Sequence, residues 1–536
     1  MNEQMVNELV HKLTIEEMVG QTLCYDIYDK DDPDEVEKVI QEIRPGGIFV
    51  TDMSADKIKM YTEMVNKYVK VPVIVSADIE FGVGCALSSY KKLPHPMAWG
   101  ACGDEKLIRR AGELTAALCR KNGIHWSFAP VVDINYNKNN PVVNIRSISE
   151  SPDLVWRIAA AYSKGMQTNG YMAVGAKHFP GDGVDDRNQH YCTTVNSFSR
   201  HKWMKTYGKV YRKMISNGIS SVMAAHICLP AFQKKESETP LPSVLSARLL
   251  QGLLREKLGF KGCIVSDAMS MIGACSRAKP EELAVKFLNA GGDMVLFPEK
   301  TDFKNILSAV KNGNLKKERL EDAVKHILLM KNFTRLFEDQ DVIKAELQGS
   351  YEDEYNEVAR LIAEKSIKIE RNEGNLPFNI NSVKKVLMLN LGEHQNLQDE
   401  KIFLPLEEEL RKRGLYVESY WNKSHYEIKQ CMNNFDMVLI NAKFIPSDYS
   451  CGASLRIGWD NIMTFWRGYV LQHKNCVFVS FGDPYKLYEL PFLKTYINCF
   501  SCSEFSQIAL SKVLFGEIST TAKNPVSLPP FFYFGK

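Results

Sequence analysis

The sequence predicts an α/β protein, a (β/α)8 TIM-type barrel followed by a smaller α/β sandwich domain. Short apolar runs alternate with amphipathic helical stretches through the first 300 residues. These runs are continuously apolar, as expected for parallel strands that are covered by helices on both faces. The alternation starts again beyond residue 377, which predicts a second domain.

Eight strands follow one another in the first part of the chain. They are predicted at residues 21–25, 47–50, 73–77, 125–128, 172–176, 221–225, 263–266 and 294–297. The helices predicted between them include residues 33–42, 55–68, 105–121, 154–169 and 244–258. Eight strands alternating with helices over this length suggest a barrel, in which the carboxyl ends of all strands meet at one rim.

The second domain is separated from the barrel by a helical and turn-rich stretch. Helical patterns occupy residues 317–332 and 352–369, and a turn-rich bridge follows at residues 371–377. Strands are then predicted at residues 385–391, 437–441 and 476–481. We therefore expect the barrel over residues 1–340, a helical linker over 341–376 and the smaller α/β domain over 377–536.

The composition excludes several classes of protein. With 536 residues, 45% hydrophobic and 24% charged, the chain has the profile of a soluble protein of two or three domains. A net charge of +3, without a basic stripe interleaved with aromatics, does not favour nucleic acid as a partner. The start of the chain lacks the features of a signal peptide, and no apolar run reaches the roughly 18–20 residues of a membrane helix. The thirteen cysteines are scattered singly, which favours reduced thiols and a cytoplasmic location.

The most informative motif is Lys177-His-Phe-Pro-Gly181, with His190 shortly after it and Asp267 much further on. Polar residues follow most of the predicted strands. They are Asp78, Glu80, Asp133, Lys177, His178, His226 and Asp267, with Arg146 beyond the fourth strand. Carboxylates, cations and histidines that converge at one rim suit a polyhydroxylated ligand, whose hydroxyls need several charged partners. We therefore expect Asp133 and His226, and Asp182 after the motif, to contact the substrate. Structural roles are open for three of them, because Asp133 could cap a helix, His226 could be a core histidine and His190 an ordinary loop residue.

The Lys177-His-Phe-Pro-Gly181 run resembles the signature of glycoside hydrolase family 3, in particular of its bacterial β-N-acetylglucosaminidases. The resemblance supports closure of the strands into a barrel. It implies that Asp267, in a Ser-Asp motif after the seventh strand, is the catalytic nucleophile. It also implies that Asp78, Arg146, Lys177 and His178 contact sugar hydroxyls.

The same resemblance assigns the acid/base role to His190. In this branch the acid/base is a histidine on the loop after the signature, held by an aspartate two residues before it. A histidine can give a proton and later take one near neutral pH. The chain departs from the pattern at two positions: Asn188 occupies the place of that aspartate, and Asp182 replaces a histidine that often follows the signature glycine. We expect Asp185 or Asp186 to take over the role of the aspartate, or the enzyme to be slow on poor leaving groups.

These observations lead us to expect a retaining exo-glycosidase that removes terminal β-linked N-acetylglucosamine and uses neither metal nor cofactor. A glycoside phosphorylase with the same residues is the first alternative, because a neutral histidine would not repel phosphate as a glutamate would. A β-glucosidase and a catalytically inactive sugar-binding relative are further alternatives. The expected partner is a small carbohydrate, with neither nucleic acid nor membrane, and the sequence leaves the aglycone and the oligomeric state open.

Overall fold

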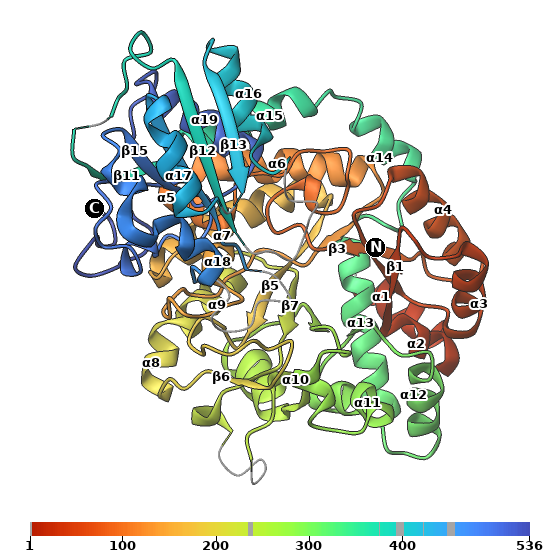
Figure 1. The fold of residues 1–536 in the computed structure, drawn as a ribbon. Coiled ribbons are helices and arrows are strands. Elements are labelled where there is room, and N and C mark those ends of the chain that lie inside the picture. Colours follow the sequence, from red (N-terminus) through yellow and green to blue (C-terminus); the bar gives the residue numbers. More distant parts are fainter. Residues whose placement is uncertain (1–2, 234–238, 375, 393–400, 422, 447–455) are drawn as a thin grey trace. The chain divides into compact units, whose positions relative to one another are not determined.

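The computed structural model of the chain describes residues 3–233, 239–374, 376–392, 401–421, 423–446 and 456–536 (Figure 1). It consists of two compact units. The first comprises Met1–Lys91, Glu105–Ile134 and Val155–Tyr355, and the second Lys92–Asp104, Asn135–Leu154 and Asn356–Lys536. The chain passes from the first unit to the second for the last time after Tyr355, inside the stretch 341–376 that was expected to link the domains. The two short segments that precede it and belong to the second unit were not foreseen.

The first unit is built on an eight-stranded parallel sheet in the order β10-β1-β2-β3-β4-β5-β7-β9. A parallel bridge between Val265 and Met294 connects its two outer strands and closes the barrel. The strands are β1 (Leu23–Tyr28), β2 (Gly47–Thr51), β3 (Ile74–Ala77), β4 (Trp126–Ser127), β5 (Ala173–Phe179), β7 (Ser221–Ala224), β9 (Cys263–Ser266) and β10 (Val295–Leu296). The predicted barrel is thus confirmed, with strand ends that differ by only a few residues.

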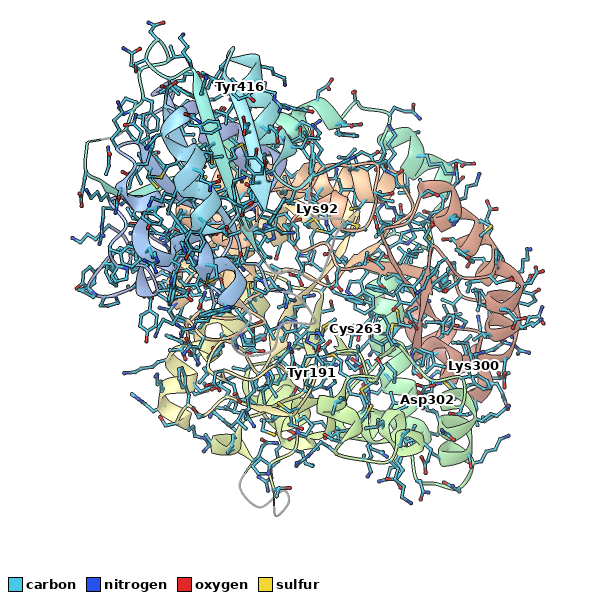
Figure 2. The ribbon with its side chains drawn as sticks, viewed as in Figure 1. Lys92, Tyr191, Cys263, Lys300, Asp302 and Tyr416 are labelled. Carbon is cyan, nitrogen blue, oxygen red and sulfur yellow. The ribbon has the colours of Figure 1, made fainter. Side chains whose placement is uncertain are left out.

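Helices precede, connect and follow the strands of the barrel. They are α1 (Glu3–Lys12), α2 (Ile15–Gln21), α3 (Pro33–Ile43), α4 (Ala55–Asn66), α6 (Glu105–Lys121), α7 (Pro152–Met166), α8 (Arg200–Lys205), α9 (Tyr207–Ser216), η6 (Arg248–Lys257), α10 (Ile272–Cys275), α11 (Pro280–Ala290), α12 (Asp302–Lys311), α13 (Lys317–Phe333) and α14 (Gln340–Glu346). The barrel interior is filled by large side chains such as Phe49, Trp126 and Phe128, and Cys263 of β9 belongs to it (Figure 2). A separate two-stranded sheet pairs β6 (Thr194–Val195) with β8 (Ile227–Cys228).

The second unit contains a six-stranded sheet in the order β11-β16-β15-β14-β12-β13. Five strands are parallel and β11 is antiparallel to its neighbour. The strands are β11 (Lys368–Asn372), β12 (Lys385–Gly392), β13 (Tyr416–Trp421), β14 (Met437–Lys443), β15 (Cys476–Ser480) and β16 (Thr495–Asn498). The helices are α5 (Pro96–Cys102), α16 (Leu404–Lys412), α17 (His425–Cys431), α18 (Trp459–Ile462) and α19 (Glu504–Leu514), while α15 (Glu352–Ser366) crosses from the first unit into the second.

The structure corrects several predicted elements. Strands β11, β13 and β16 and helix α14 were not predicted, and the helix predicted at 352–369 ends at Ser366 because β11 begins two residues later. The helix predicted at 244–258 is the π-helix η6. β13 lies at the edge of its sheet and carries polar side chains, so its sequence lacks the continuous apolar run by which the inner strands were recognised.

No helix in the part of the chain that the structure describes is long and apolar enough to cross a membrane. Within the same residues there is no group of three or more His, Cys, Asp or Glu side chains that could hold a metal ion.

Candidate active site

The barrel strands end in the polar residues from which the site is built. Asp78 follows β3 directly, Lys177 and His178 lie within the last residues of β5, and Asp267 follows β9. All four belong to the first unit. Because these strands are parallel, their carboxyl ends lie at the same rim of the barrel.

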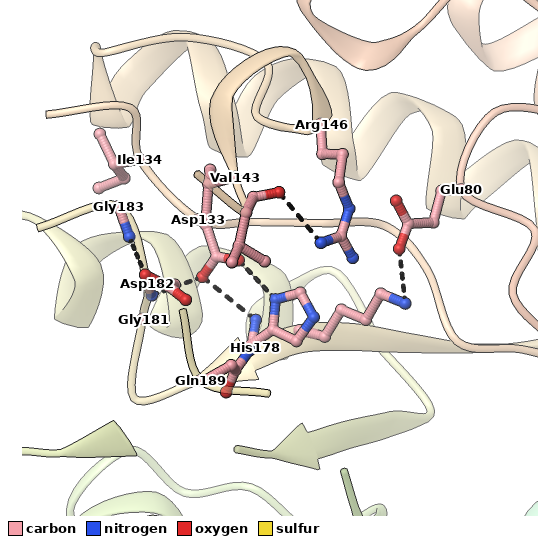
Figure 3. A network of polar contacts seen from close by, with 12 residues as sticks. Glu80, Asp133, Ile134, Val143, Arg146, His178, Gly181, Asp182, Gly183 and Gln189 are labelled. Carbon is pink, nitrogen blue, oxygen red and sulfur yellow. Dashed lines mark hydrogen bonds and ion pairs between the residues drawn. The ribbon is translucent and has the colours of Figure 1, made fainter. Parts of the chain in front are cut away.

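Lys177 forms an ion pair with two carboxylates. Its Nζ lies 2.5 Å from Asp78 Oδ1 and 2.7 Å from Glu80 Oε1; Figure 3 shows the pair with Glu80. The Lys177 side chain is only 4% exposed, whereas that of Asp78 is 47% exposed. A buried ammonium is tolerated when it is paired in this way, and the pairing holds Asp78 in place while part of its carboxylate faces solvent. Glu80 was noted after the third strand but was not among the predicted site residues.

Asp133 is fully buried and organises the residues around it (Figure 3). Its Oδ2 lies 2.6 Å from His178 Nδ1, and its Oδ1 accepts the backbone N–H groups of His178 at 3.2 Å and Asp182 at 2.7 Å. A carboxylate can only accept a hydrogen bond, so His178 Nδ1 carries the hydrogen of this bond. The second ring nitrogen, Nε2, takes no part in the contact with Asp133. Asp133 was predicted to contact the sugar, but in this structure it positions His178 and the following turn.

The turn that contains Asp182 is held by aromatic and amide side chains. Tyr207 donates to the Asp182 carbonyl at 2.5 Å, and Asn196 donates to the Gly181 carbonyl at 2.9 Å. Gly181 has φ +116°, and a Cβ there would lie 2.2 Å from the Tyr207 ring, so only glycine fits. The Asp182 side chain is 2% exposed and accepts the Gly183 N–H at 2.6 Å. The buried Asp182 carboxylate therefore stabilises the turn through this hydrogen bond.

His190 is held by Asn188. The Asn188 Oδ1 atom accepts the His190 backbone N–H at 2.9 Å and lies 2.6 Å from His190 Nδ1. Because the atom that receives the backbone N–H must be the amide oxygen, Nδ1 of the imidazole must be its second donor. The ring therefore has Nδ1–H toward Asn188 and Nε2 for chemistry. This is the tautomer that an aspartate would impose, without the charge.

The neighbouring aspartates have other roles or positions. Asp185 accepts hydrogen bonds from the Arg187 side chain and from the Val195 N–H, the latter at 2.8 Å. Burial disfavours its charge, but these bonds hold the pKa of Asp185 below its usual value. Asp186 is exposed. Asn188, and not Asp185, is thus the residue that contacts His190 at the dyad position.

The loop that carries His190 is fastened to the segment after Asp267. The Ile272 N–H donates to the His190 carbonyl at 3.1 Å, and Thr193 Oγ1 donates to the Gly273 carbonyl at 2.9 Å. A Cβ on Gly273 would lie 2.5 Å from the Gln189 carbonyl oxygen, which shows how closely α10 approaches the loop. The same element that follows Asp267 therefore positions His190.

Asp267 is partly exposed, and its charge is stabilised by nearby histidines. Its Oδ1 accepts the Ala268 N–H at 2.9 Å. Burial opposes ionisation, but His226, His178 and His190 together with the Ala268 N–H hold the pKa of Asp267 below its usual value. The carboxylate is therefore charged at neutral pH, as a nucleophile must be.

His226 is completely buried. Its Nε2 lies 2.9 Å from the Ala268 carbonyl oxygen, to which it donates, and its backbone N–H donates to Gln189 Oε1 at 3.3 Å. Burial lowers the pKa of His226 despite the attraction of Asp267. His226 was predicted to contact substrate, but in the structure its backbone N–H contacts Gln189 of the His190 loop and its ring contacts the residue after Asp267.

Arg146 differs from the other predicted residues in that it belongs to the second unit. It ends the short helix η2 (Asn144–Arg146), and its guanidinium donates to the Val142 carbonyl at 3.1 Å. Its contact with sugar stays a prediction. The structure thus brings the other predicted residues, from Asp78 to Asp267, into one unit.

Comparisons with known proteins agree on one family. The model described as glycosyl hydrolase family 3 N terminal domain matches residues 14–330. A Cellulomonas fimi protein named β-N-acetylglucosaminidase/β-glucosidase is 30% identical over 532 residues, covering 95% of this chain and 93% of that protein. The solved structure of the β-glucoside phosphorylase BglX, bound to 2FGlc, is 29% identical, with a TM-score of 0.88 over 98% of this chain and 96% of the other. A family 3 β-N-acetylglucosaminidase from Paenibacillus sp. str. FPU-7 is 26% identical, with a TM-score of 0.84 over 96% of this chain and 99% of the other.

Proposed function

We propose, since the chain belongs to glycosyl hydrolase family 3, that it removes terminal β-linked N-acetylglucosamine with retention, using Asp267 as nucleophile and His190 as acid/base. The chain is a glycoside hydrolase with a (β/α)8 barrel. The observation that carries the assignment is that α10, which closely follows Asp267, is hydrogen-bonded to the His190 loop at two points. The name of the Cellulomonas fimi relative supports the sugar.

The first step forms a glycosyl-enzyme. Asp267 Oδ1 is held by the Ala268 N–H, so Oδ2 attacks the anomeric carbon. Protonated His190 gives its Nε2 proton to the glycosidic oxygen as the bond to the anomeric carbon breaks, and the aglycone leaves as an alcohol.

The second step releases the sugar. His190 is now neutral, with Nδ1–H directed to Asn188, so Nε2 is the atom that takes a proton from water. The resulting hydroxide oxygen bonds to the anomeric carbon while the bond to Asp267 breaks, which restores the carboxylate and the imidazolium.

The remaining polar residues of the first unit bind the sugar or position the residues that do. We assign the sugar hydroxyls to the half-exposed Asp78 with its partner Lys177, and to His178 Nε2. Asp133 and His226, both fully buried, hold His178 and the His190 loop. Charge-assisted hydrogen bonds of this kind are the strongest that a neutral sugar can receive.

Phosphorolysis is the second candidate, and the Asn188–His190 pair favours it. The group that contacts His190 Nδ1 is the neutral amide of Asn188, where an aspartate would carry a negative charge. An anionic acceptor therefore meets less electrostatic repulsion beside His190 than it would beside an Asp–His pair. Phosphate would attack the glycosyl-enzyme in place of water, giving a sugar 1-phosphate and free Asp267. The similarity to BglX, which is named a β-glucoside phosphorylase, points the same way.

The test compares wild type with Asp267→Asn on 4-nitrophenyl β-N-acetylglucosaminide and β-glucoside, with and without phosphate. We expect the variant to lose turnover by about 10³-fold or more, because the amide is a poor nucleophile. Asp186→Asn is the matched control, since Asp186 is an exposed carboxylate of the His190 loop. Near-normal turnover by Asp267→Asn would refute the assignment, and binding without turnover in wild type would indicate an inactive relative.

The same assays identify the sugar and the reaction. The relative rates on the two 4-nitrophenyl glycosides decide between an N-acetylglucosaminidase and a β-glucosidase. Free sugar or sugar 1-phosphate as product decides between hydrolysis and phosphorolysis.

A further inference from the structure

Charge is distributed unevenly along the barrel. Residues 187–235 contain no Asp or Glu, although the whole chain is nearly neutral. The Lys and Arg residues of this stretch are Arg187, Arg200, Lys202, Lys205, Lys209, Arg212, Lys213, Lys234 and Lys235. Most of those within α8 and α9 are exposed. The two helices, yellow in Figure 1, therefore present a positive surface.

A cavity of about 450 Å³ opens beside the start of α8, and we call it the α8 cavity. It is lined by Ser199, Arg200, Ala231, Phe232 and Arg248, and none of these is acidic. The Arg200 guanidinium lies 4.8 Å from the centre of the Phe232 ring, and Lys257 Nζ lies 5.7 Å from it. Three cations thus lie at one cavity or its aromatic wall, an arrangement that an anion would stabilise.

The α8 cavity is tied to the candidate active site through the two-stranded sheet. β6 pairs with β8 in parallel, Thr194 opposite Ile227. His190 precedes β6 and His226 precedes β8, whereas the cavity residues Ser199 and Phe232 follow the same two strands. The cavity therefore lies a few residues beyond the site histidines on both segments.

We propose that the α8 cavity, with the cations of α8 and α9, binds carboxylate or phosphate groups on an acidic glycan. The Arg200 guanidinium can bind an oxyanion through paired N–H donors, and Arg248 adds a second positive charge to the cavity lining. Phe232 is buried and holds the Arg200 side chain at the cavity, while the partly exposed Ala231 supplies a small apolar surface beside the cations. That the ligand is a glycan rests on the proposed function, whereas the anion chemistry rests on the cavity alone.

The surface chemistry favours a glycan over two other polyanions. Among the described residues of α8 and α9 there is no exposed large apolar side chain, so the face lacks the groups that insert into a lipid surface. The cavity has one aromatic ring, and that ring is only 7% exposed, so it offers no platform for stacked bases.

The experiment measures retention of the full chain in native gels that contain polygalacturonate, phosphorylated dextran or neutral dextran. We expect the acidic polymers to retard the wild type, with an effect that weakens as salt is added. Arg200→Gln/Arg248→Gln should weaken this binding by about ten-fold or more. The matched control is Lys300→Gln/Lys316→Gln, which removes the same charge from exposed positions elsewhere on the barrel and should bind as wild type does. Comparing the two acidic polymers separates carboxylate from phosphate.

Three outcomes would overturn the proposal: no retention of wild type, equal loss in both double variants, or equal retention by duplex DNA. Turnover of 4-nitrophenyl glycosides should be unchanged in both double variants. A failure of the α8 cavity is therefore distinguishable from a failure of the proposed catalytic residues, which would abolish that turnover in the wild type itself.

Discussion

The chemistry of the site depends on a single amide. Asn188 gives His190 the same tautomer that an aspartate would give, because its oxygen accepts the hydrogen from Nδ1. It does not supply the negative charge that stabilises an imidazolium. In serine proteases, replacing the triad aspartate by asparagine costs roughly 10⁴ in rate, although there the tautomer also changes. Here the tautomer is preserved, so the effect of the missing charge can be measured separately.

Asn188→Asp should therefore speed the cleavage of poor leaving groups. We expect kcat for a simple alkyl β-N-acetylglucosaminide to rise about ten-fold, and the alkaline limb of the pH–rate profile to move to higher pH. The kcat for aryl substrates should change little, because their acidic leaving groups depart with little protonation.

The control for this change is Asn188→Ala, which removes the hydrogen bond without adding charge. It should slow alkyl and aryl substrates alike, because the His190 ring loses its orientation. Equal behaviour of the Asp and Ala variants would show that Asn188 does not act through His190.

The positions of single site residues could be predicted from their neighbours in sequence, but the burial of their side chains could not. The strand-end positions of Asp78, Lys177, His178 and Asp267 could be recognised because each follows an apolar run. That Asp133 and His226 are fully buried could not, because burial depends on residues that are distant in sequence, such as Asp182 and Ala268. Glu80 was noted but was not assigned to the site, because the sequence gives no sign that Asp78 and Glu80 both pair with Lys177.

At the scale of elements, α10 determines where the His190 loop lies. Gly273 has no side chain, and a Cβ there would lie 2.5 Å from the Gln189 carbonyl oxygen and 2.7 Å from His226 Cβ. Both contacts are with parts of the site that position His190. The close approach requires glycine because any larger residue would push the loop and the helix apart.

Gly273→Ala should thus impair catalysis more than folding. We expect kcat to fall about ten-fold or more, since a displacement of a catalytic group by roughly 1 Å can cost about 10² in rate. Gly252→Ala is the matched control, because no atom lies within 4 Å of its added Cβ. Kinetics and thermal melts of both variants check this, and equal kinetics in the two would contradict the role of α10.

The elements that the sequence predicted best are the buried parallel strands. Each of the eight barrel strands was located to within a few residues from a short apolar run, although β1 also contains Asp26 and β5 ends with Lys177 and His178 before Phe179. β13 and β11 escaped because Glu418 and the charged residues around Glu370 interrupt the apolar pattern at positions that are not fully buried. The π-helix η6 could not be distinguished from an α-helix because both give an apolar stripe along one face.

At the scale of the whole molecule, the division into units differs from a division along the chain. The segments Lys92–Asp104 and Asn135–Leu154 interrupt the barrel sequence and join the second unit. Their side chains, such as Met97 and Ile145, pack in the core of that unit. A sequence pattern identifies helices and strands but does not show which core an apolar side chain enters, so these excursions and the placement of Arg146 could not be foreseen.

The stability of the barrel should depend on pH through Lys331 of α13. Its Nζ is completely buried and donates to Gln21 Oε1 at 2.7 Å and the Pro72 carbonyl at 2.8 Å. Burial lowers the pKa of Lys331 to about 7. The unfolded chain keeps this proton up to a pH of about 10, so the free energy of unfolding gains a contribution that rises from neutral pH to about pH 10.

Lys331→Met should remove that contribution. The difference between wild-type and variant stability, measured by denaturant unfolding from pH 7 to 10, should grow with pH in favour of the wild type. Lys317→Met, an exposed lysine on the same helix, should leave the slope unchanged. A pH-independent difference for Lys331→Met would mean that Lys331 is charged in the folded barrel.

The central claim, that Asp267 carries the covalent sugar, is tested most directly by trapping. A 2-deoxy-2-fluoro-β-glucosyl fluoride slows both steps but activates the first through its leaving group, so the glycosyl-enzyme accumulates and is measured by mass spectrometry of the intact chain and its peptides. We expect one added glycosyl group, on the peptide that contains Asp267, and none in Asp267→Asn. A label on another carboxylate, or labelling that persists in Asp267→Asn, would contradict the claim.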